Sequence, residues 1–310
     1  MVESLVILCV LLTLSPEGKP GEPESADSAI SSPKRKLVFG RVSDNFRKHY
    51  PRARAMVDYV VPRLKDLGIE EGEVQLYKSN EDLIQAIQAG KVDWISETPF
   101  SAVILREKTG AEMVLRRWKK KVDSYNSIFI TRKGNGVESL SDLKGKKIAF
   151  EDPGSTSAYF IPRALLEREG LELVELENPR DKVPPGKVGY LFAGGELNIA
   201  TWVHRGLVSA GAFSNLDWDD SDHTPESFKE KLVIFYQSKF FPRAVELLNK
   251  DLDPRIKERI VEILLAADQD PEGRQALKEF NKTKKFDKID PETREALIEV
   301  KELLRYIPSP

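Results

Sequence analysis

Short apolar segments alternate with amphipathic segments along most of this 310-residue chain, and this alternation constrains its fold more than any other feature. In the first set, strands are expected at 37–42, 74–79 and 92–95, with helices at 53–67 and 81–90 between them. Apolar residues at helical spacing and a terminal Gly68 mark the first of these helices. Strand–helix–strand units of this length predict parallel strands with helices packed on the sheet.

A second set of elements follows the first. Strands are expected at 127–132, 146–152, 171–176, 207–213 and 231–238, and helices at 140–145, 158–168 and 196–206. The remainder is expected to be mostly helical, with amphipathic segments at 243–249, 254–267, 273–280 and 291–304. The sequence therefore predicts an α/β protein with two halves, each a mostly parallel sheet flanked by helices, and a helical C-terminal tail.

Composition excludes several classes of function. The net charge of −2 gives no bulk attraction for nucleic acid or anionic lipid. Cys9 is the single cysteine, so no disulfide framework or cysteine metal site is expected. His49, His204 and His223 are scattered and lack metal-ligand spacing. With no phosphate-binding glycine loop and no nucleophile elbow, we expect neither a cofactor nor a catalytic centre.

The N-terminal region has the features of an export segment. Residues 5–14 read LVILCVLLTL, a run too short to span a bilayer but suited to the core of a signal peptide. A buried N-terminal strand is the alternative interpretation. Leu8 before Cys9 argues against a lipoprotein anchor. Residues 15–35 are rich in Pro, Gly, Ser and Glu, which predicts a disordered linker before the folded part.

Three consecutive hydroxyl residues, Ser155, Thr156 and Ser157, follow a Pro-Gly break and open the helix expected at 158–168. The first amides of a helix have no intrahelical partner, and that end of the helix carries partial positive charge. Hydroxyls there can bind an oxyanion together with the amides. A plain N-cap is the alternative, although a cap needs only one hydroxyl.

The stretch DPGSTSAYFIPRALLEREG resembles the D-P-x-S-T-S-G-x-x-x-P-x-x-x-L motif of the phosphate, phosphite and phosphonate substrate-binding proteins of ABC transporters. Other segments resemble that family in the same order. These are GKVDWISETPF (90–100), VDSYNSIFITR (122–132), SLSDLKGKKIAF (139–150), LVSAGAF (207–213), SKFFP (238–242) and DPEGRQALKEF (270–280). The resemblance runs from about residue 37 to residue 280.

The resemblance implies a type II periplasmic-binding fold, with a ligand held in the cleft between two lobes. Lobe one would comprise 36–123 plus 232–310, and lobe two 124–231. The ligand's oxyanion would be held from lobe two by the hydroxyl run. The other ligand-binding residues that the resemblance implies are Tyr125 on the crossover, Thr98 in a first-lobe loop, Ser43 and Tyr77.

The sequence departs from the family at three positions that face ligand side groups. Glu97 stands where the family has an aromatic or apolar residue. Glu196 aligns with a family histidine, or with the acid beside it after a shift of one residue, and Ser209 replaces an acid. Either glutamate could accept a proton from a monoprotonated oxyanion, read a cationic or hydroxyl group on the ligand, or simply face solvent or cap a helix.

The strongest basic run is RRWKKK at 116–121. Trp118 among these cations leaves a nucleic-acid interpretation open. A solvated edge of a lobe is the favoured one, and the run could also steer anions toward the cleft.

The sequence therefore predicts an exported, monomeric, non-enzymatic protein that captures a small phosphorus oxyanion or phosphonate and delivers it to an ABC permease. Closure of the two lobes would bury the ligand. One alternative is an extracytoplasmic sensor that docks on a membrane histidine kinase. A second alternative is an enzyme on the same fold, for which no acid–base pair or Cys/His cluster is apparent.

Overall fold

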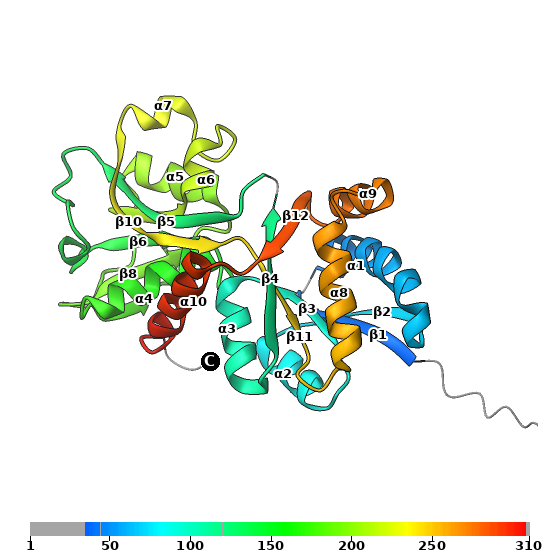
Figure 1. Cartoon of the computed structure of the whole chain (residues 1–310). Coiled ribbons are helices and arrows are strands. Elements are labelled where there is room, and N and C mark those ends of the chain that lie inside the picture. Colours follow the sequence, from blue (N-terminus) through cyan, green and yellow to red (C-terminus); the bar gives the residue numbers. More distant parts are fainter. Residues whose placement is uncertain (1–34, 44, 120, 308–310) are drawn as a thin grey trace, which may run out of the picture. The chain divides into compact units, whose positions relative to one another are not determined.

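A computed structural model of the chain describes residues 35–43, 45–119 and 121–307. The apolar run expected to be a signal core and nearly all of the expected linker lie outside these residues. The described part forms two six-stranded mixed sheets with helices packed on them (Figure 1). None of the helices within the described ranges has both the length and the apolar character needed to cross a membrane.

The first sheet has the strand order β12-β4-β11-β3-β1-β2. Its strands are β1 (Arg35–Val42), β2 (Ile69–Tyr77), β3 (Trp94–Glu97), β4 (Glu112–Lys119), β11 (Val245–Leu248) and β12 (Thr283–Lys288). Strand β1 pairs in parallel with β2 and β3, whereas the other pairings are antiparallel. Helices of this lobe are α1 (Phe46–Val60), η1 (Val61–Leu67), α2 (Asn80–Gln88), α3 (Pro99–Thr109), α8 (Pro254–Ala266) and α9 (Pro271–Glu279).

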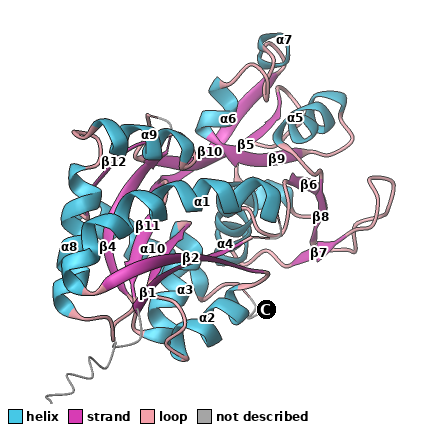
Figure 2. Cartoon of the chain, turned by 90° about the vertical axis from the view of Figure 1, so that its right-hand side faces the viewer, coloured by secondary structure: helices cyan, strands magenta, loops and turns pink. Residues whose placement is uncertain are grey.

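The second sheet has the strand order β10-β5-β9-β6-β8-β7. Its strands are β5 (Ser124–Arg132), β6 (Lys147–Phe150), β7 (Leu173–Glu175), β8 (Val188–Phe192), β9 (Ala210–Ser214) and β10 (Leu232–Pro242). Strands β6 to β9 pair in parallel, and β5 is antiparallel to β9 and β10. Its helices are η2 (Leu140–Leu143), η3 (Thr156–Phe160), α4 (Ile161–Arg168), α5 (Glu196–Arg205), α6 (Asn215–Asp219) and α7 (Glu226–Lys229), and the last three group together in Figure 2.

Local sequence explains where the helices start and stop. The Asn45 side chain caps α1 by accepting from the Lys48 amide, so this helix begins one turn or more before the expected residue 53. Gly68 ends the following 3₁₀ segment with φ of 80°, a left-handed conformation that glycine adopts without a Cβ penalty. Ser79 caps α2, one residue earlier than the sequence suggested.

Three sequence expectations for local structure were wrong. Residues 243–249 were expected to be helical but contain β11, and residues 283–288, in the part expected to be mostly helical, form β12. The basic run at 116–121 was taken as a solvated edge, but its first four residues end β4. All three segments are short strands whose pairing partners are distant in sequence, so local periodicity carries little information about them.

The lobe boundary also differs from the expected one. Strand β10 pairs along its length with β5, so the second sheet continues to Pro242 and the chain returns to the first sheet only at β11. The sequence pattern indicated this strand but not its partner. The C-terminal helix α10 (Pro291–Leu304) contacts α3 of the first lobe and both α4 and β10 of the second (Figure 1, red).

One hydrophobic cluster is continuous between the two lobes. It contains buried residues of α2 and α3 as well as residues of α4, α10 and the second sheet. Phe100 of α3 stacks on Phe160 of η3 with ring centroids 4.2 Å apart. These contacts fix the end of the second sheet that carries Ser155–Ser157 against the first lobe.

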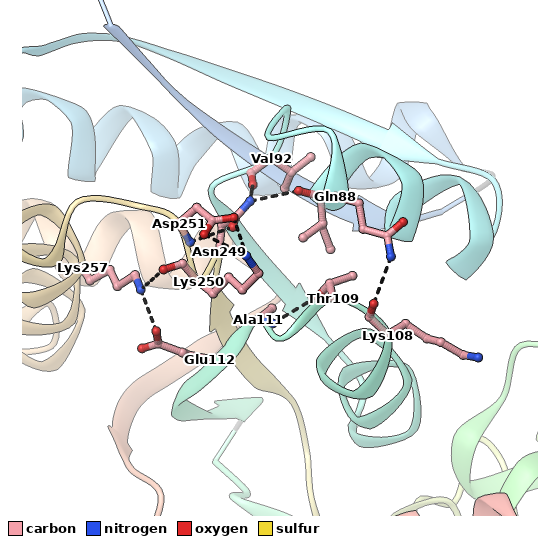
Figure 3. Close-up of polar contacts among 11 residues, drawn as sticks. Gln88, Val92, Lys108, Thr109, Ala111, Glu112, Asn249, Lys250, Asp251 and Lys257 are labelled. Carbon is pink, nitrogen blue, oxygen red and sulfur yellow. Dashed lines mark hydrogen bonds and ion pairs between the residues drawn. The ribbon is translucent and has the colours of Figure 1, made fainter.

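Asn249, directly after β11, joins three segments of the first lobe (Figure 3). Its Nδ2 donates to the carbonyls of Ile87, at 3.1 Å, and Val92, at 2.9 Å. Its Oδ1 accepts from the Asp251 amide at 3.1 Å. Because the side chain is buried, these bonds hold α2 and the start of β3 against the returning chain.

Candidate functional site

The hydroxyl run lies at the carboxyl end of β6, where ligands bind in open α/β sheets. Ser155 caps the helix, since its side chain accepts from the Ala158 amide at 3.2 Å. Thr156 to Phe160 form a π-helical turn, a feature frequent at functional sites. Thr156 is only 4% exposed, and its Oγ1 is buried without a hydrogen bond of good geometry. A cap therefore accounts for Ser155 but not for its two neighbours.

Tyr125 connects the hydroxyl run to the crossover between the lobes. It is buried at the start of β5, and its phenol lies beside the hydroxyls of Ser157 and Thr156, but the Thr156 contact lacks hydrogen-bond geometry. Burial raises the pKa of Tyr125, so the phenol keeps its proton and can donate it to an anion. The Arg243 guanidinium lies over the face of the Tyr125 ring, with Cζ 4.2 Å from the ring centroid.

The two expected residues at the end of β3 have different environments. Glu97 is 5% exposed and does not face solvent; its Oε1 accepts from the Val42 amide at 2.5 Å and its Oε2 from the Thr98 amide at 3.3 Å. Burial raises the pKa of Glu97, against the lowering effect of nearby Arg41. Thr98 is the N-cap residue of α3, but its side chain makes no capping hydrogen bond and remains available.

Ser43 and Tyr77 lie at neighbouring strand ends, and the Ser43 amide donates to the Tyr77 carbonyl. Both side chains already have partners. The Ser43 hydroxyl is 2.5 Å from His49 Nδ1 and also accepts from the Asn45 amide, and the Tyr77 hydroxyl donates to Gln75. A ligand would have to displace these bonds, so their direct role stays a prediction.

A group of cations that the sequence analysis did not identify lies at the first-lobe side of this region. Arg41 is at the end of β1, Arg117 and Lys119 end β4, and Arg243 links β10 to β11. Their charges act on one another: burial, then Arg243, Arg117 and Arg41, lower the pKa of Lys119 to about 7. Burial also lowers the pKa of Arg117 to about 10, against the raising effect of Glu246.

The ion pairs of this cation group are incomplete. Arg117 Nε lies 3.3 Å from Glu246 Oε1, and that buried carboxylate also accepts from Trp94 Nε1 and Ser96 Oγ. Arg41, Lys119 and Arg243 have no ion pair with any carboxylate that the structure describes. The Nε atoms of Arg41 and Arg243 are buried without a hydrogen bond.

The clue to this cation group was the RRWKKK run, which we interpreted as a solvated edge. In β4, however, Arg117 is 4% exposed and stacks on Phe280, while Arg116 binds Asp287 on the opposite side of the strand. If the run had been predicted as a strand, its alternate residues would have been expected on opposite faces of the sheet. Arg41 and Arg243 are isolated in the sequence and give no comparable signal.

Carboxylates and a histidine border the hydroxyl run on the second lobe. Burial and then the charge of Glu196 raise the pKa of Glu151 to about 7. Glu196, Asp217 and His223 offer atoms within 4.8 Å of one another, the one such group in the described ranges that could hold a metal ion. His223 Nδ1 already bonds Asp217 Oδ1 at 2.8 Å, and although burial lowers the histidine's pKa, this bond raises it overall.

The third departure from the family pattern, Ser209, lies away from this region. It immediately precedes β9, which runs parallel to β6, so it stands at the amino end of these strands. There it lines a surface pocket with Lys146, Lys147 and Arg180. The hydroxyl run is at the opposite, carboxyl end.

The candidate site therefore joins cations that lack ion pairs, Arg41, Lys119 and Arg243, to the unpartnered hydroxyl of Thr156 through Tyr125. Buried polar atoms without partners each cost about 1–3 kcal/mol, and several of them gather here. Charge-assisted hydrogen bonds to an oxyanion would satisfy guanidinium, ammonium and hydroxyl groups together.

Comparisons with known proteins identify the family of the chain. The profile of a family described as "ABC transporter, phosphonate, periplasmic substrate-binding protein" matches residues 50–293. The chain is 26% identical over 188 residues to the phosphate-import protein PhnD of Mycolicibacterium smegmatis, a match that covers 57% of this chain and 56% of that protein.

Solved structures share the fold of this chain. XAC2383 from Xanthomonas citri bound to chloride has a TM-score of 0.78 and 35% identity, over 87% of this chain and 98% of that one. The same protein bound to ATP matches at 0.78 and 34%, over 88% and 99%. PhnD1 from Prochlorococcus marinus, at 19% identity and a TM-score of 0.61 over 89% of this chain and 100% of that one, shares the fold. The chain belongs to the family of periplasmic substrate-binding proteins of phosphonate ABC transporters.

Proposed function

We propose that this chain captures a small phosphorus oxyanion or phosphonate between its two lobes and delivers it to an ABC permease. The proposal rests on two groups that lie on either side of Tyr125. One is the Thr156 hydroxyl, which is buried without a hydrogen bond, and the other is the Arg243 guanidinium, which has no ion pair among the described residues. One relative, XAC2383, is described in separate structures with chloride and with ATP, which are both anions. A second relative, PhnD of Mycolicibacterium smegmatis, is named for phosphate import. Both facts support an anionic ligand.

The family also guides the cellular role. Members are periplasmic proteins of importers, so we infer that this chain acts outside the cytoplasm as a monomer that docks on a permease. We further infer that it releases its ligand unchanged rather than acting as an enzyme. Recovery of intact ligand after prolonged incubation, followed by ³¹P NMR, tests that inference, and any turnover would contradict it.

Thr156→Val is the variant that tests the proposed binding role most cleanly. Valine keeps the shape of threonine and removes a buried hydroxyl that has no partner, so the apo stability should stay the same or rise slightly. Affinity for the phosphorus ligand should fall by about tenfold or more, since one good hydrogen bond to a charged group contributes about 1.5–3 kcal/mol. Thermal shift and calorimetry with phosphate, phosphite, methylphosphonate, 2-aminoethylphosphonate, sulfate and arsenate measure both effects.

Thr131→Val is the matched control. Thr131 is a buried threonine of the same sheet whose hydroxyl bonds the Ser209 carbonyl at 2.8 Å and Asn135 Oδ1 at 2.9 Å. This variant should lose stability and keep its affinity, the opposite of Thr156→Val. Absence of a thermal shift with every phosphorus compound would rule out the proposed ligand class.

A further inference from the structure

The cation group and the hydroxyl run are two adjacent sets of ligand donors that come from different lobes. The hydroxyls belong to the β6–α4 connection of the second sheet. Arg41 and Lys119 end strands of the first sheet, and Arg243 lies on the segment between the sheets. Tyr125 touches both sets, with Arg243 over its ring and Ser157 beside its hydroxyl. The donors therefore extend over more than one helix start.

The charge of the cation group exceeds what the protein itself neutralises. When Lys119 is protonated, Arg41, Arg117, Lys119 and Arg243 carry four positive charges that act on one another. The buried carboxylates facing them are Glu246, paired with Arg117, and Glu97, which acts on Arg41 and Arg117. Even with both carboxylates ionised, one positive charge remains uncompensated among the described residues, and two remain when Lys119 is protonated.

This excess is costly in the unliganded protein. Like charges held together in partly desolvated surroundings repel, and the buried Nε atoms of Arg41 and Arg243 lack the hydrogen bonds that water would give them. Arg63, Arg116 and Arg259, by contrast, each bind carboxylates. Arginines whose Nε atoms are buried with neither a hydrogen bond nor an ion pair to any described residue indicate a ligand that supplies the missing charge.

We propose that the ligand carries two anionic groups, one phosphoryl group held by Ser155–Ser157 and a second phosphate or carboxylate held by Arg41, Lys119 and Arg243. The chemical class is therefore a diphosphate or a phosphonocarboxylate rather than a phosphonate with a neutral or amine-bearing substituent. This inference rests on the proposed function, because it assigns the first group to the same hydroxyls. It assigns the first-lobe cations, which the sequence resemblance did not include, to the second group.

Calorimetry on the full chain with four probes tests the proposal: inorganic pyrophosphate, phosphonoacetate, methylphosphonate and inorganic phosphate, all with a chelator present. Pyrophosphate or phosphonoacetate should bind at least tenfold more tightly than methylphosphonate and phosphate. In Lys119→Met and Arg243→Met this preference should fall to threefold or less, mainly through weaker binding of the two-group probes. Ser157→Ala should weaken all probes together, and Lys121→Met, an exposed neighbour, should change none.

Each outcome separates this inference from the proposed function. Methylphosphonate or phosphate binding as tightly as the two-group probes would overturn the inference and leave the proposed function intact. A preference that persists in both Lys119→Met and Arg243→Met would also overturn it. Binding of none of the four probes would overturn both. Circular dichroism of the variants checks that each one is folded.

Discussion

Glu246→Gln is expected to lower the free energy of unfolding by about 3–5 kcal/mol, the usual loss when one partner of a buried ion pair is removed. Glu246 is fully buried on β11 and accepts from Trp94 Nε1 at 2.7 Å and Ser96 Oγ at 2.6 Å while it faces Arg117. An amide nitrogen in place of one oxygen would face a donor. The variant would also leave Arg117 without its counter-charge inside a group that is already positive.

Glu112→Gln is the control, measured by chemical unfolding under the same conditions. Glu112 lies on the adjacent strand β4 and pairs with Lys257 at 2.6 Å, but the carboxylate is about half exposed (Figure 3). Its loss should cost about 1 kcal/mol or less. Adding Arg117→Met to Glu246→Gln should recover at least half of the lost stability, because the arginine that lost its counter-charge is then removed as well. A loss below about 1 kcal/mol for Glu246→Gln alone would show that the pair does not neutralise Arg117.

Lys119→Met should have the opposite effect and stabilise the unliganded protein, on the order of 4 kcal/mol near neutral pH. Burial and the three neighbouring guanidinium groups lower the pKa of Lys119 from 10.5 to about 7. The unfolded chain holds this proton more tightly than the folded chain does, so the charged lysine opposes folding. A neutral side chain of similar length removes that penalty.

The pH dependence of the Lys119 effect has a definite sign. Above pH 10.5 the lysine is neutral in both states, so the two proteins should be equally stable. As pH falls from 10.5 to 7 the unfolded state gains the proton first, and the advantage of Lys119→Met should grow to its full size below pH 7. Unfolding at pH 6, 7.5 and 9.5, with Lys121→Met as an exposed control, measures it. A variant less stable than the parent at pH 6 would contradict the account.

The effects expected for Glu246→Gln and Lys119→Met have one cause: the positive charges of the cation group lower the stability of the unliganded protein. The cations Arg41, Lys119 and Arg243 weaken the apo protein and would strengthen the complex, a common relation between stability and function. Glu246 limits the instability by neutralising one of the four charges.

Strong periodic or capping signals made much of the fold predictable from sequence. The helices expected at 254–267, 273–280 and 291–304 were confirmed. Each has an apolar face, and each begins with an aspartate cap followed by a proline, at Pro254, Pro271 and Pro291 respectively. Short antiparallel strands such as β11 and β12 were missed, since their four to six residues are stabilised by partners far away in the chain.

The candidate site was predictable only where residues are contiguous. Ser155–Ser157 stand out as three hydroxyls in a row, and the structure places Tyr125 beside them. Arg41 and Arg243 are ordinary arginines in the sequence, and only tertiary structure brings them together from positions about two hundred residues apart. Glu97 was an unexplained acid in the sequence, and its hydrogen bonds to two backbone amides now give it a structural environment.

A crystal structure of the full chain with pyrophosphate tests the central claim most directly. We expect one phosphoryl group within hydrogen-bond reach of Thr156, Ser157 and Tyr125, and the second group in contact with Lys119 or Arg243. The surface pocket lined by Lys146, Lys147 and Arg180 offers an alternative basic site at the other end of the second sheet. Ordered pyrophosphate in that pocket alone, with the Thr156 hydroxyl still without a partner, would contradict the account.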